Sequence, residues 1–167
     1  ADMFDILITG ALVADGTGRE LFRADAAIMG GRIARIGTGL GEAARAIDGT
    51  GKVLCPGFID MHTHMDLELL RDRKPDAKIR QGVTTEVTGQ CGESGAPRGS
   101  EGSGIFGNAS GSTPDQTWTS FDEYLTALDR NGVGVNLASL VGHGTIRIAG
   151  MGYDDRPPTG EEMARMK

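Results

Sequence analysis

The segment from Cys55 to Asp66 constrains the fold most, because an apolar run there ends in two histidines separated by a single residue. The pattern predicts a β-strand over 58–64, in which successive side chains point to opposite faces. One face of that strand would carry Phe58, Asp60, His62 and His64. Two imidazoles at the mouth of a barrel strand are placed to bind one metal ion. A histidine pair at this spacing also occurs at ordinary polar strand ends, so the pair alone leaves both interpretations open.

The amino-acid pattern changes at Pro56 and divides the chain into residues 1–56 and 57–167. The first part consists of short apolar runs between polar turns, which predicts a small β-sheet or part of a β-sandwich. Gly30-Gly31 lies between two of these runs and predicts a tight hairpin turn. The strands expected in this part are 4–8 and 11–14, joined at Thr9-Gly10, and then 26–29, 32–36, 46–47 and 52–54.

The second part alternates expected strands with helices, which favours an α/β fold. A helix is expected from Pro75 to Gly82, and a strand rich in β-branched residues follows over 83–89. With strand 58–64 they form a βαβ unit, whose strands are parallel and whose crossover is right-handed. The other expected features are a third strand over 135–141 and capping boxes at Ser120 and Thr159, the first opening a helix that ends at Asn131-Gly132.

Three expected strand ends carry residues of the kind that binding sites use. His62 and His64 end the first strand, Cys91 follows the second and His143 follows the third. The ends of parallel strands meet at one edge of a sheet, so the histidine pair and Cys91 are expected to be neighbours. A thiolate at Cys91 would bind zinc tightly. The alternative is a buried, inert thiol, and Cys55, which precedes the first strand, is assigned to that class.

Three more polar side chains near these strand ends each allow two interpretations. His143 either faces a substrate or has its ring nitrogens satisfied by backbone groups. Asp60 and Asp66 flank the histidine pair. They either orient the imidazoles as hydrogen-bond acceptors or are ordinary surface and turn carboxylates.

Composition excludes several classes of partner. The net charge is −6, and no basic stripe occurs, so nucleic acids and anionic membranes are not expected as partners. No apolar run approaches the length of about 18 residues that spans a bilayer, and no basic-then-apolar leader is present. Two cysteines are too few for a disulfide framework. A cytoplasmic location is therefore expected.

The Gly/Ser-rich stretch 99–113 is either a linker or a loop over the active-site face of a barrel.

The barrel expected from these strands is incomplete. Three strands with two crossovers cannot close a barrel, and the helix that begins at Thr159 has only a few residues before Lys167. The chain is therefore expected to be an incomplete fragment, whose barrel is completed by the remainder of the same polypeptide or by a second chain.

Three stretches together resemble a known family. Pro56 to His64 resembles the first barrel strand of the amidohydrolase superfamily, metal-dependent hydrolases built from a (β/α)8 barrel and a small β-sandwich. Gly82 to Gly92 and Leu140 to Arg147 look like the D-aminoacylases, or N-acyl-D-amino-acid deacylases, within it. The similarity runs from about Asp5 to Gly152, and Cys91 after the second strand is its most specific element.

The resemblance implies roles for particular residues. His62 and His64 would serve one metal position, and Cys91 would bind the principal zinc and bridge to a second, weaker position. The remaining zinc ligands and the catalytic aspartate would lie beyond Lys167. Met65 departs from the family, whose members often carry a polar or acidic residue there, beside the aspartate that matches Asp66.

The implied activity is the zinc-dependent hydrolysis of the amide bond of small N-acyl-D-amino acids. Zinc lowers the pKa of bound water to about 7, which suits such a reaction. Two alternatives stay open. One is a cyclic-amide hydrolase of the dihydroorotase or hydantoinase type, which does not need a cysteine after the second strand. The other is a metal-free protein with a structural or interaction role, although such relatives tend to lose the histidine pair.

Overall fold

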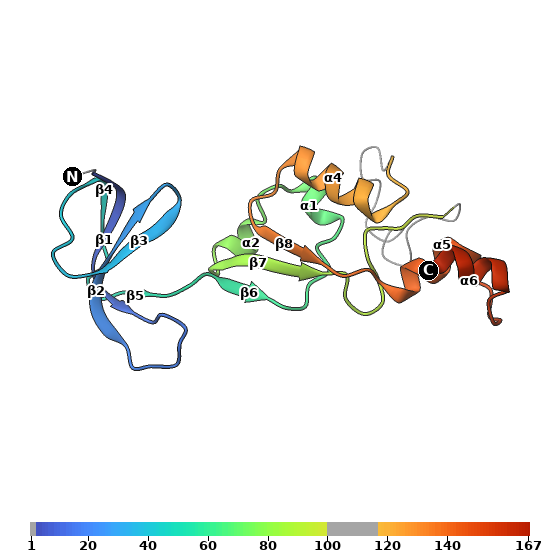
Figure 1. Cartoon of the computed structure of the whole chain (residues 1–167), viewed down its shortest axis with the longest axis horizontal. Helices are drawn as coiled ribbons and strands as arrows, with labels where there is room; N and C mark the ends of the chain where they lie inside the picture. Colours follow the sequence, from blue (N-terminus) through green and yellow to red (C-terminus); the bar gives the residue numbers. More distant parts are fainter. Residues whose placement is uncertain (1–2, 100–116) are drawn as a thin grey trace. The chain divides into compact units, whose positions relative to one another are not determined.

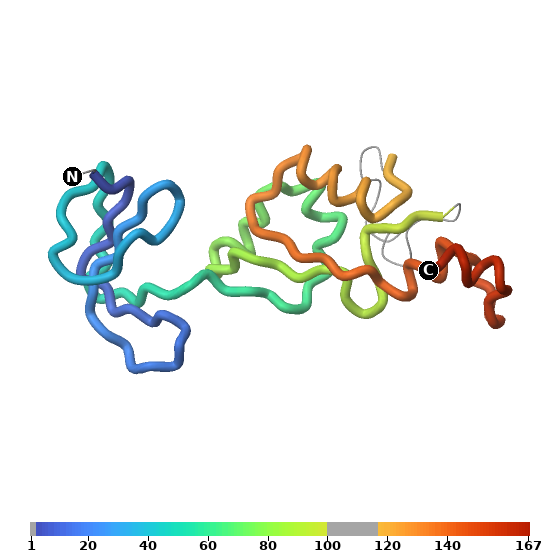
Figure 2. The backbone as a smooth tube through the Cα atoms, in the orientation of Figure 1, coloured from blue at the N-terminus to red at the C-terminus, as the bar shows by residue number. Residues whose placement is uncertain are grey.

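The structure is a computed structural model that describes residues 3–99 and 117–167. Its chain divides into two compact units, unit 1 (Ala1–Pro56) and unit 2 (Gly57–Lys167) (Figures 1 and 2). The expected Gly/Ser-rich loop over 99–113 lies outside the described residues, except for Gly99. In the described ranges, every helix is too short or too polar to cross a membrane.

Unit 1 is a mixed β-sheet. Its strands follow the order β3-β2-β1-β4, and β5 also pairs with β1. Strand β1 runs antiparallel to β2 but parallel to β4 and β5. The strands are β1 (Phe4–Val13), β2 (Phe22–Met29), β3 (Arg32–Gly37), β4 (Ala43–Asp48) and β5 (Val53–Leu54).

The structure confirms the hairpin and corrects the strand that precedes it. Gly30 and Gly31 have φ values of 58° and 72°, and they join β2 to β3. The strands expected at 4–8 and 11–14 are one strand, β1, instead of two strands with a turn. Gly10 at the expected turn has a φ of 69°, and its N–H donates to the Asp25 carboxylate. The chain therefore passes this point as a bulge, which glycine allows without the cost of a Cβ.

One face of unit 1 has an apolar hollow of about 210 Å³, whose lining includes Val13, Ile28, Ile33 and Leu54. Cys55 also lines it and is exposed, so the expectation of a buried thiol was wrong. The reason is that β5 is only two residues long and ends before this residue.

Unit 2 is a three-stranded parallel sheet with helices on one side. The strand order is β6-β7-β8, and both pairings are parallel, as the βαβ pattern predicts. Figure 1 shows α1, α2 and α4 on the same side of this sheet. The elements are β6 (Phe58–Asp60), α1 (Glu68–Arg71), α2 (Asp76–Ile79), β7 (Val83–Thr88), α4 (Phe121–Asn131), β8 (Asn136–Ser139), α5 (His143–Met151) and α6 (Gly160–Met166).

Several expected elements of unit 2 are shorter than predicted, and one of them is the strand expected over 135–141, which is β8, Asn136–Ser139. The strand expected over 58–64 ends at Asp60, because the chain bends there and the Asp60 carboxylate accepts the N–H of His62. The helix expected from Pro75 to Gly82 is the single turn α2. Gly82 has a φ of 86°, which prevents the helix from continuing. Helices α1 and α5 were not predicted; α1 is one turn long, and such a turn has no periodic pattern to detect.

The core of unit 2 lies between the sheet and its helices. Leu69 and Tyr124 are fully buried there, and the Tyr124 hydroxyl donates to the Asp66 carbonyl at 2.8 Å. Glu86 on β7 faces the same side and is also fully buried. Ile59, which points to the other face, is 58% exposed. The residues described here therefore cover only one face of the parallel sheet.

Both predicted capping boxes are present, and the one at Ser120 makes stability depend on pH. The Glu123 carboxylate accepts the backbone N–H groups of Ser120 and Thr119, which lower its pKa to about 2. A carboxyl group whose pKa is lowered by folding stabilises the fold at pH values above its ordinary pKa of 4.5, and that stability is lost as the pH falls toward 2.

We expect Glu123→Gln to unfold at a lower urea concentration than the wild type at pH 6, and we expect the difference between the two proteins to shrink by pH 3.

The control for this prediction is Asp122→Asn, which changes a neighbouring acid in the first turn of the same helix but outside the capping box. Its stability difference from the wild type should vary less between pH 6 and pH 3. A Glu123→Gln difference that stays constant over this range would contradict the assignment of the pH dependence to the capping carboxylate.

Candidate metal centre

Two histidines and one cysteine of unit 2 meet at the carboxyl ends of neighbouring parallel strands. His62 and His64 lie just after β6, and Cys91 lies just after β7. Their ligand atoms are all within 4.8 Å of one another. His62 Nε2 is 3.2 Å from Cys91 Sγ, and the two imidazole centroids are 5.5 Å apart. The structure therefore brings together the three residues that the sequence selects, although the histidines occupy a bend instead of a strand.

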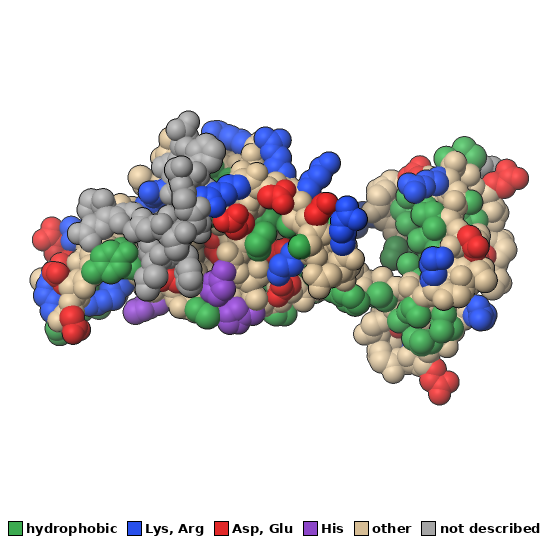
Figure 3. Space-filling model, turned by 180° about the vertical axis from the view of Figure 1, so that it is seen from behind, with side chains coloured by type: hydrophobic (Ala, Val, Ile, Leu, Met, Phe, Trp, Pro, Cys, Tyr) green, Lys and Arg blue, Asp and Glu red, His purple; other side chains and the backbone are tan. Residues whose placement is uncertain are grey.

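This donor set fits a zinc ion. Bond lengths of about 2.0–2.1 Å to nitrogen and 2.3 Å to sulfur place tetrahedral ligand atoms roughly 3.5 Å apart. The observed distance between His62 Nε2 and Cys91 Sγ is close to that value. All three side chains are exposed, so further ligands, water or a substrate can reach the same point. Figure 3 shows histidine side chains gathered on one face of the molecule.

The backbone at Cys91 is strained. Cys91 has a φ of 55° and is the one residue other than glycine with a positive φ in the described ranges. The N–H of Glu93 donates to the Gln90 carbonyl and closes the turn around it. Strained backbone held by its surroundings is typical of binding and catalytic sites. The turn therefore sets where the sulfur atom points.

A side chain that sequence reasoning missed connects the two ligand-bearing segments. Gln90 Nε2 donates to the carbonyl oxygen of Met61 at 3.0 Å. The N–H of Thr63 donates to the Val87 carbonyl at 3.3 Å. Met61 and Thr63 lie on either side of His62, and their partners Gln90 and Val87 both precede Cys91, so the two bonds hold the ligand-bearing segments together. The only signal in the sequence was that Gln90 immediately precedes Cys91.

Asp60 and Asp66 have different roles in the structure. Asp60 accepts the backbone N–H of His62 and pairs with Lys78, which lowers its pKa. Asp66 is buried, which raises its pKa, and its carboxylate accepts the N–H of Gly89 at 3.0 Å. His64 lies close enough to Asp66 to lower that pKa in part. Both carboxylates therefore hold backbone beside the metal ligands, and the orientation of an imidazole by Asp66 stays a prediction.

His143 is not part of the three-residue cluster. It is exposed and is the first residue of α5. The start of this helix lies against the turn after Cys91, because Thr145 N–H donates to the Gly92 carbonyl and Gly142 N–H donates to Ser94 Oγ. A role for His143 toward the substrate stays a prediction.

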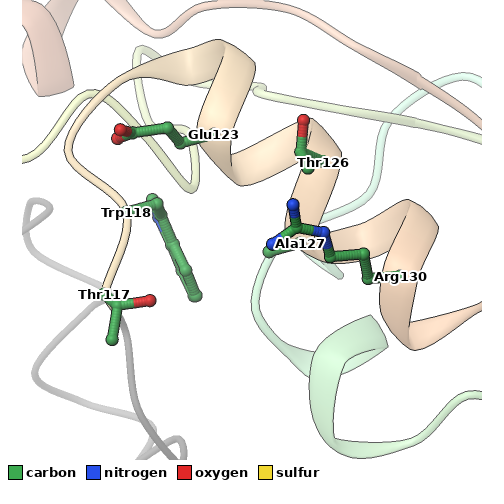
Figure 4. A pocket seen from close by; sticks show the side chains of 6 residues that line it. All are labelled: Thr117, Trp118, Glu123, Thr126, Ala127 and Arg130. Atoms are coloured by element: carbon green, nitrogen blue, oxygen red, sulfur yellow. The ribbon is translucent and has the colours of Figure 1, made fainter.

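Unit 2 also has a hollow on its surface, and its lining contains none of these residues. It has a volume of about 330 Å³ and lies along α4 and the segment before it (Figure 4). Its lining consists of Thr117, Trp118, Glu123, Thr126, Ala127 and Arg130.

Comparison with known proteins finds a matching family and several similar proteins. Residues 45–167 match the model described as the amidohydrolase family. A D-aminoacylase from Alcaligenes xylosoxydans xylosoxydans is 42% identical over 165 residues, which cover 98% of this chain and 34% of that protein. An N-acyl-D-aspartate deacylase from the same organism is 39% identical over 98% of this chain and 33% of its own length.

A solved structure of a similar protein contains zinc. The N-acyl-D-glutamate deacylase from Bordetella bronchiseptica, complexed with zinc and a phosphonate that mimics the tetrahedral intermediate, matches with a TM-score of 0.88 at 40% identity. The match covers 99% of this chain and 35% of that one. The chain thus spans about a third of the length of the relatives that it matches.

Proposed function

The chain belongs to the amidohydrolase family, and from this premise we propose that it forms part of a zinc-dependent hydrolase of N-acyl-D-amino acids. The reaction would cleave the amide bond and release a carboxylic acid and a free D-amino acid. The observation that carries the proposal is the convergence of His62, His64 and Cys91 within 4.8 Å. Support also comes from the similar proteins, which are named as D-aminoacylase and N-acyl-D-aspartate deacylase.

In the proposed enzyme, this chain supplies metal-binding residues. Cys91, His62 and His64 would hold zinc, which lowers the pKa of bound water and polarises the amide carbonyl when it is present. The imidazoles are exposed, so a substrate could approach a metal ion bound by these residues. Gln90 and the Asp60 carboxylate keep the ligand-bearing segments in place. The catalytic aspartate and the remaining zinc ligands are assigned to positions beyond Lys167, on the strength of the family resemblance. We propose one tight zinc position and a second, weaker one, with Cys91 as a ligand of both.

The proposed architecture follows from the parallel sheet. Unit 2 would supply the first three strands of a (β/α)8 barrel, and unit 1 would supply part of a small β-sandwich. Support comes from the strand order β6-β7-β8 and from the helices on one side of that sheet. The face that carries Ile59 would then point into the barrel, where side chains of the other strands fill the interior.

The test is a panel of substrates offered to the full-length protein loaded with zinc. We expect hydrolysis of N-acetyl-D-methionine, N-acetyl-D-glutamate or N-acetyl-D-aspartate, and no turnover of the matching L enantiomers. Treatment with a chelator should abolish the activity, and added zinc should restore it. Turnover of hydantoin or dihydroorotate, with none of the N-acyl-D-amino acids, would reverse the proposal in favour of a cyclic-amide hydrolase.

A further inference from the structure

A helix of unit 2 is connected to a metal ligand through one carboxylate. Lys78 on α2 forms an ion pair with Oδ2 of Asp60, at the end of β6. The other oxygen of Asp60, Oδ1, accepts the backbone N–H of His62 at 3.2 Å. The side chains of Lys78 and Asp60 are 27% and 26% exposed, so the pair is mostly shielded from water. The contacts run without a break from the helix to the first histidine of the metal cluster.

The ion pair defines the orientation of the Asp60 carboxylate. A hydrogen bond from an aspartate to the N–H two residues later is common in turns, and by itself it leaves the carboxylate free to turn away. An ammonium on the second oxygen gives a charge-assisted bond, which is shorter and stronger than a neutral one. With both oxygens occupied, the carboxylate holds the His62 backbone where β6 ends.

A second, buried carboxylate lies beside Asp60. Glu86 lies beside Asp60 in the register of β6 and β7 and is fully buried. In the described part of the chain, neither of its oxygens accepts a hydrogen bond of ordinary geometry. Burial raises the pKa of Glu86, and the positive charge of Lys78 opposes that shift. A counter-charge stabilises a buried carboxylate, so the Lys78 ammonium interacts favourably with acidic groups of two adjacent strands.

We propose that Lys78 is a positioning residue for the metal ligand His62 and that it acts through Asp60. The inference rests on the proposed zinc site and adds to it a group that touches neither metal nor substrate. Groups that orient metal ligands from the next layer typically contribute 10- to 100-fold to metal affinity. A contribution of about that size is expected here.

The experiment measures zinc affinity in the full-length protein by competition with a chromophoric chelator. Lys78→Met keeps the aliphatic stem and removes the charge, and we expect zinc to bind about 10- to 100-fold more weakly. Lys74→Met removes an exposed lysine four residues earlier and should leave the affinity unchanged. Cobalt absorption provides a second readout, because its bands should change with the geometry of His62 in Lys78→Met and stay as in the wild type in Lys74→Met.

A double-mutant cycle tests whether Lys78 acts through Asp60. Asp60→Asn keeps an oxygen for the His62 N–H but cannot form the ion pair, and it should weaken zinc binding by a similar factor. Adding Lys78→Met to this background should change the affinity by less than about twofold, because the two residues form one unit. Losses that multiply would show that Lys78 acts by another route and would overturn the proposal.

Four further results are decisive. Zinc binding by Lys78→Met that equals the wild type would reject the proposal, even if the variant unfolds more easily. Tighter binding would mean that the ammonium acts through its charge and not through position, which also rejects it. If Lys78→Met does not fold, Asp60→Asn carries the test, and wild-type affinity in that variant is the rejecting result. A wild-type protein that binds no zinc would instead refute the proposed function itself.

Discussion

Cys91→Ala in the full-length protein is expected to lose most of its zinc and to hydrolyse N-acyl-D-amino acids more than about 100-fold more slowly. The factor exceeds the 10- to 100-fold range of residues that act on a metal from the next layer, because a direct ligand is removed. Cys91 is the one thiol in the cluster, and its sulfur lies 3.2 Å from His62 Nε2. Metal content by mass spectrometry and the rate with N-acetyl-D-methionine are the two measurements.

The chain offers a matched control in its other cysteine. Cys55→Ala changes the same kind of side chain in unit 1, which contains none of the three metal-binding candidates. Zinc content and rate should stay at the wild-type values in this variant. Full zinc content in Cys91→Ala would remove the main support for the proposed metal site and, with it, for the deacylase assignment.

Gly89→Ala is expected to cost about 2–5 kcal/mol of unfolding free energy in unit 2. Gly89 has a φ of 78°, a conformation that costs other residues about 1–2 kcal/mol. A Cβ at this position would also lie only 2.0 Å from the carbonyl oxygen of Leu140. That contact is with backbone, which cannot rotate away, and overpacking of this kind typically costs about 1–3 kcal/mol. The loss is a large share of the roughly 5–15 kcal/mol that stabilises a typical domain.

Gly132→Ala separates the two causes. Gly132 also has a positive φ, 73°, but a Cβ there would have no atom within 4 Å. We expect this variant to lose only the conformational part, about 1–2 kcal/mol. Urea unfolding of the wild type and both variants gives the comparison. Equal losses in Gly89→Ala and Gly132→Ala would show that the close approach of Leu140 does not matter.

Local signals in the sequence predict those parts of the fold whose structure depends on a few adjacent residues. The capping boxes at Ser120 and Thr159 are such cases, because an N-cap hydroxyl and a glutamate three residues later satisfy each other's backbone groups. The Gly30-Gly31 hairpin is another, since glycine tolerates the positive φ values that the turn requires. The parallel order of β6, β7 and β8 follows from the alternation of strands and helices.

The failures of prediction have physical causes. Strand 58–64 was overextended because the bend after Asp60 depends on a hydrogen bond to its side chain, which an apolar-polar pattern cannot reveal. The expected turn at Thr9-Gly10 is a bulge because β2 pairs with β1 both before and after it, while β4 pairs before it and β5 after it. Cys55 was expected to be buried, but β5 ends at Leu54 and leaves it exposed, and the end of so short a strand has no signal in the sequence.

The sequence by itself determined the donor set of the candidate site: two imidazoles after one strand and a thiol after the next, in the part of the chain that alternates strands with helices. These are properties of residue type and spacing, which the chain carries before it folds. Only the tertiary structure decided how the donors are held. Gln90 reaching Met61, and Lys78 reaching Asp60, join residues 29 and 18 positions apart. Such contacts form only when packing brings distant segments together, and no local pattern specifies them.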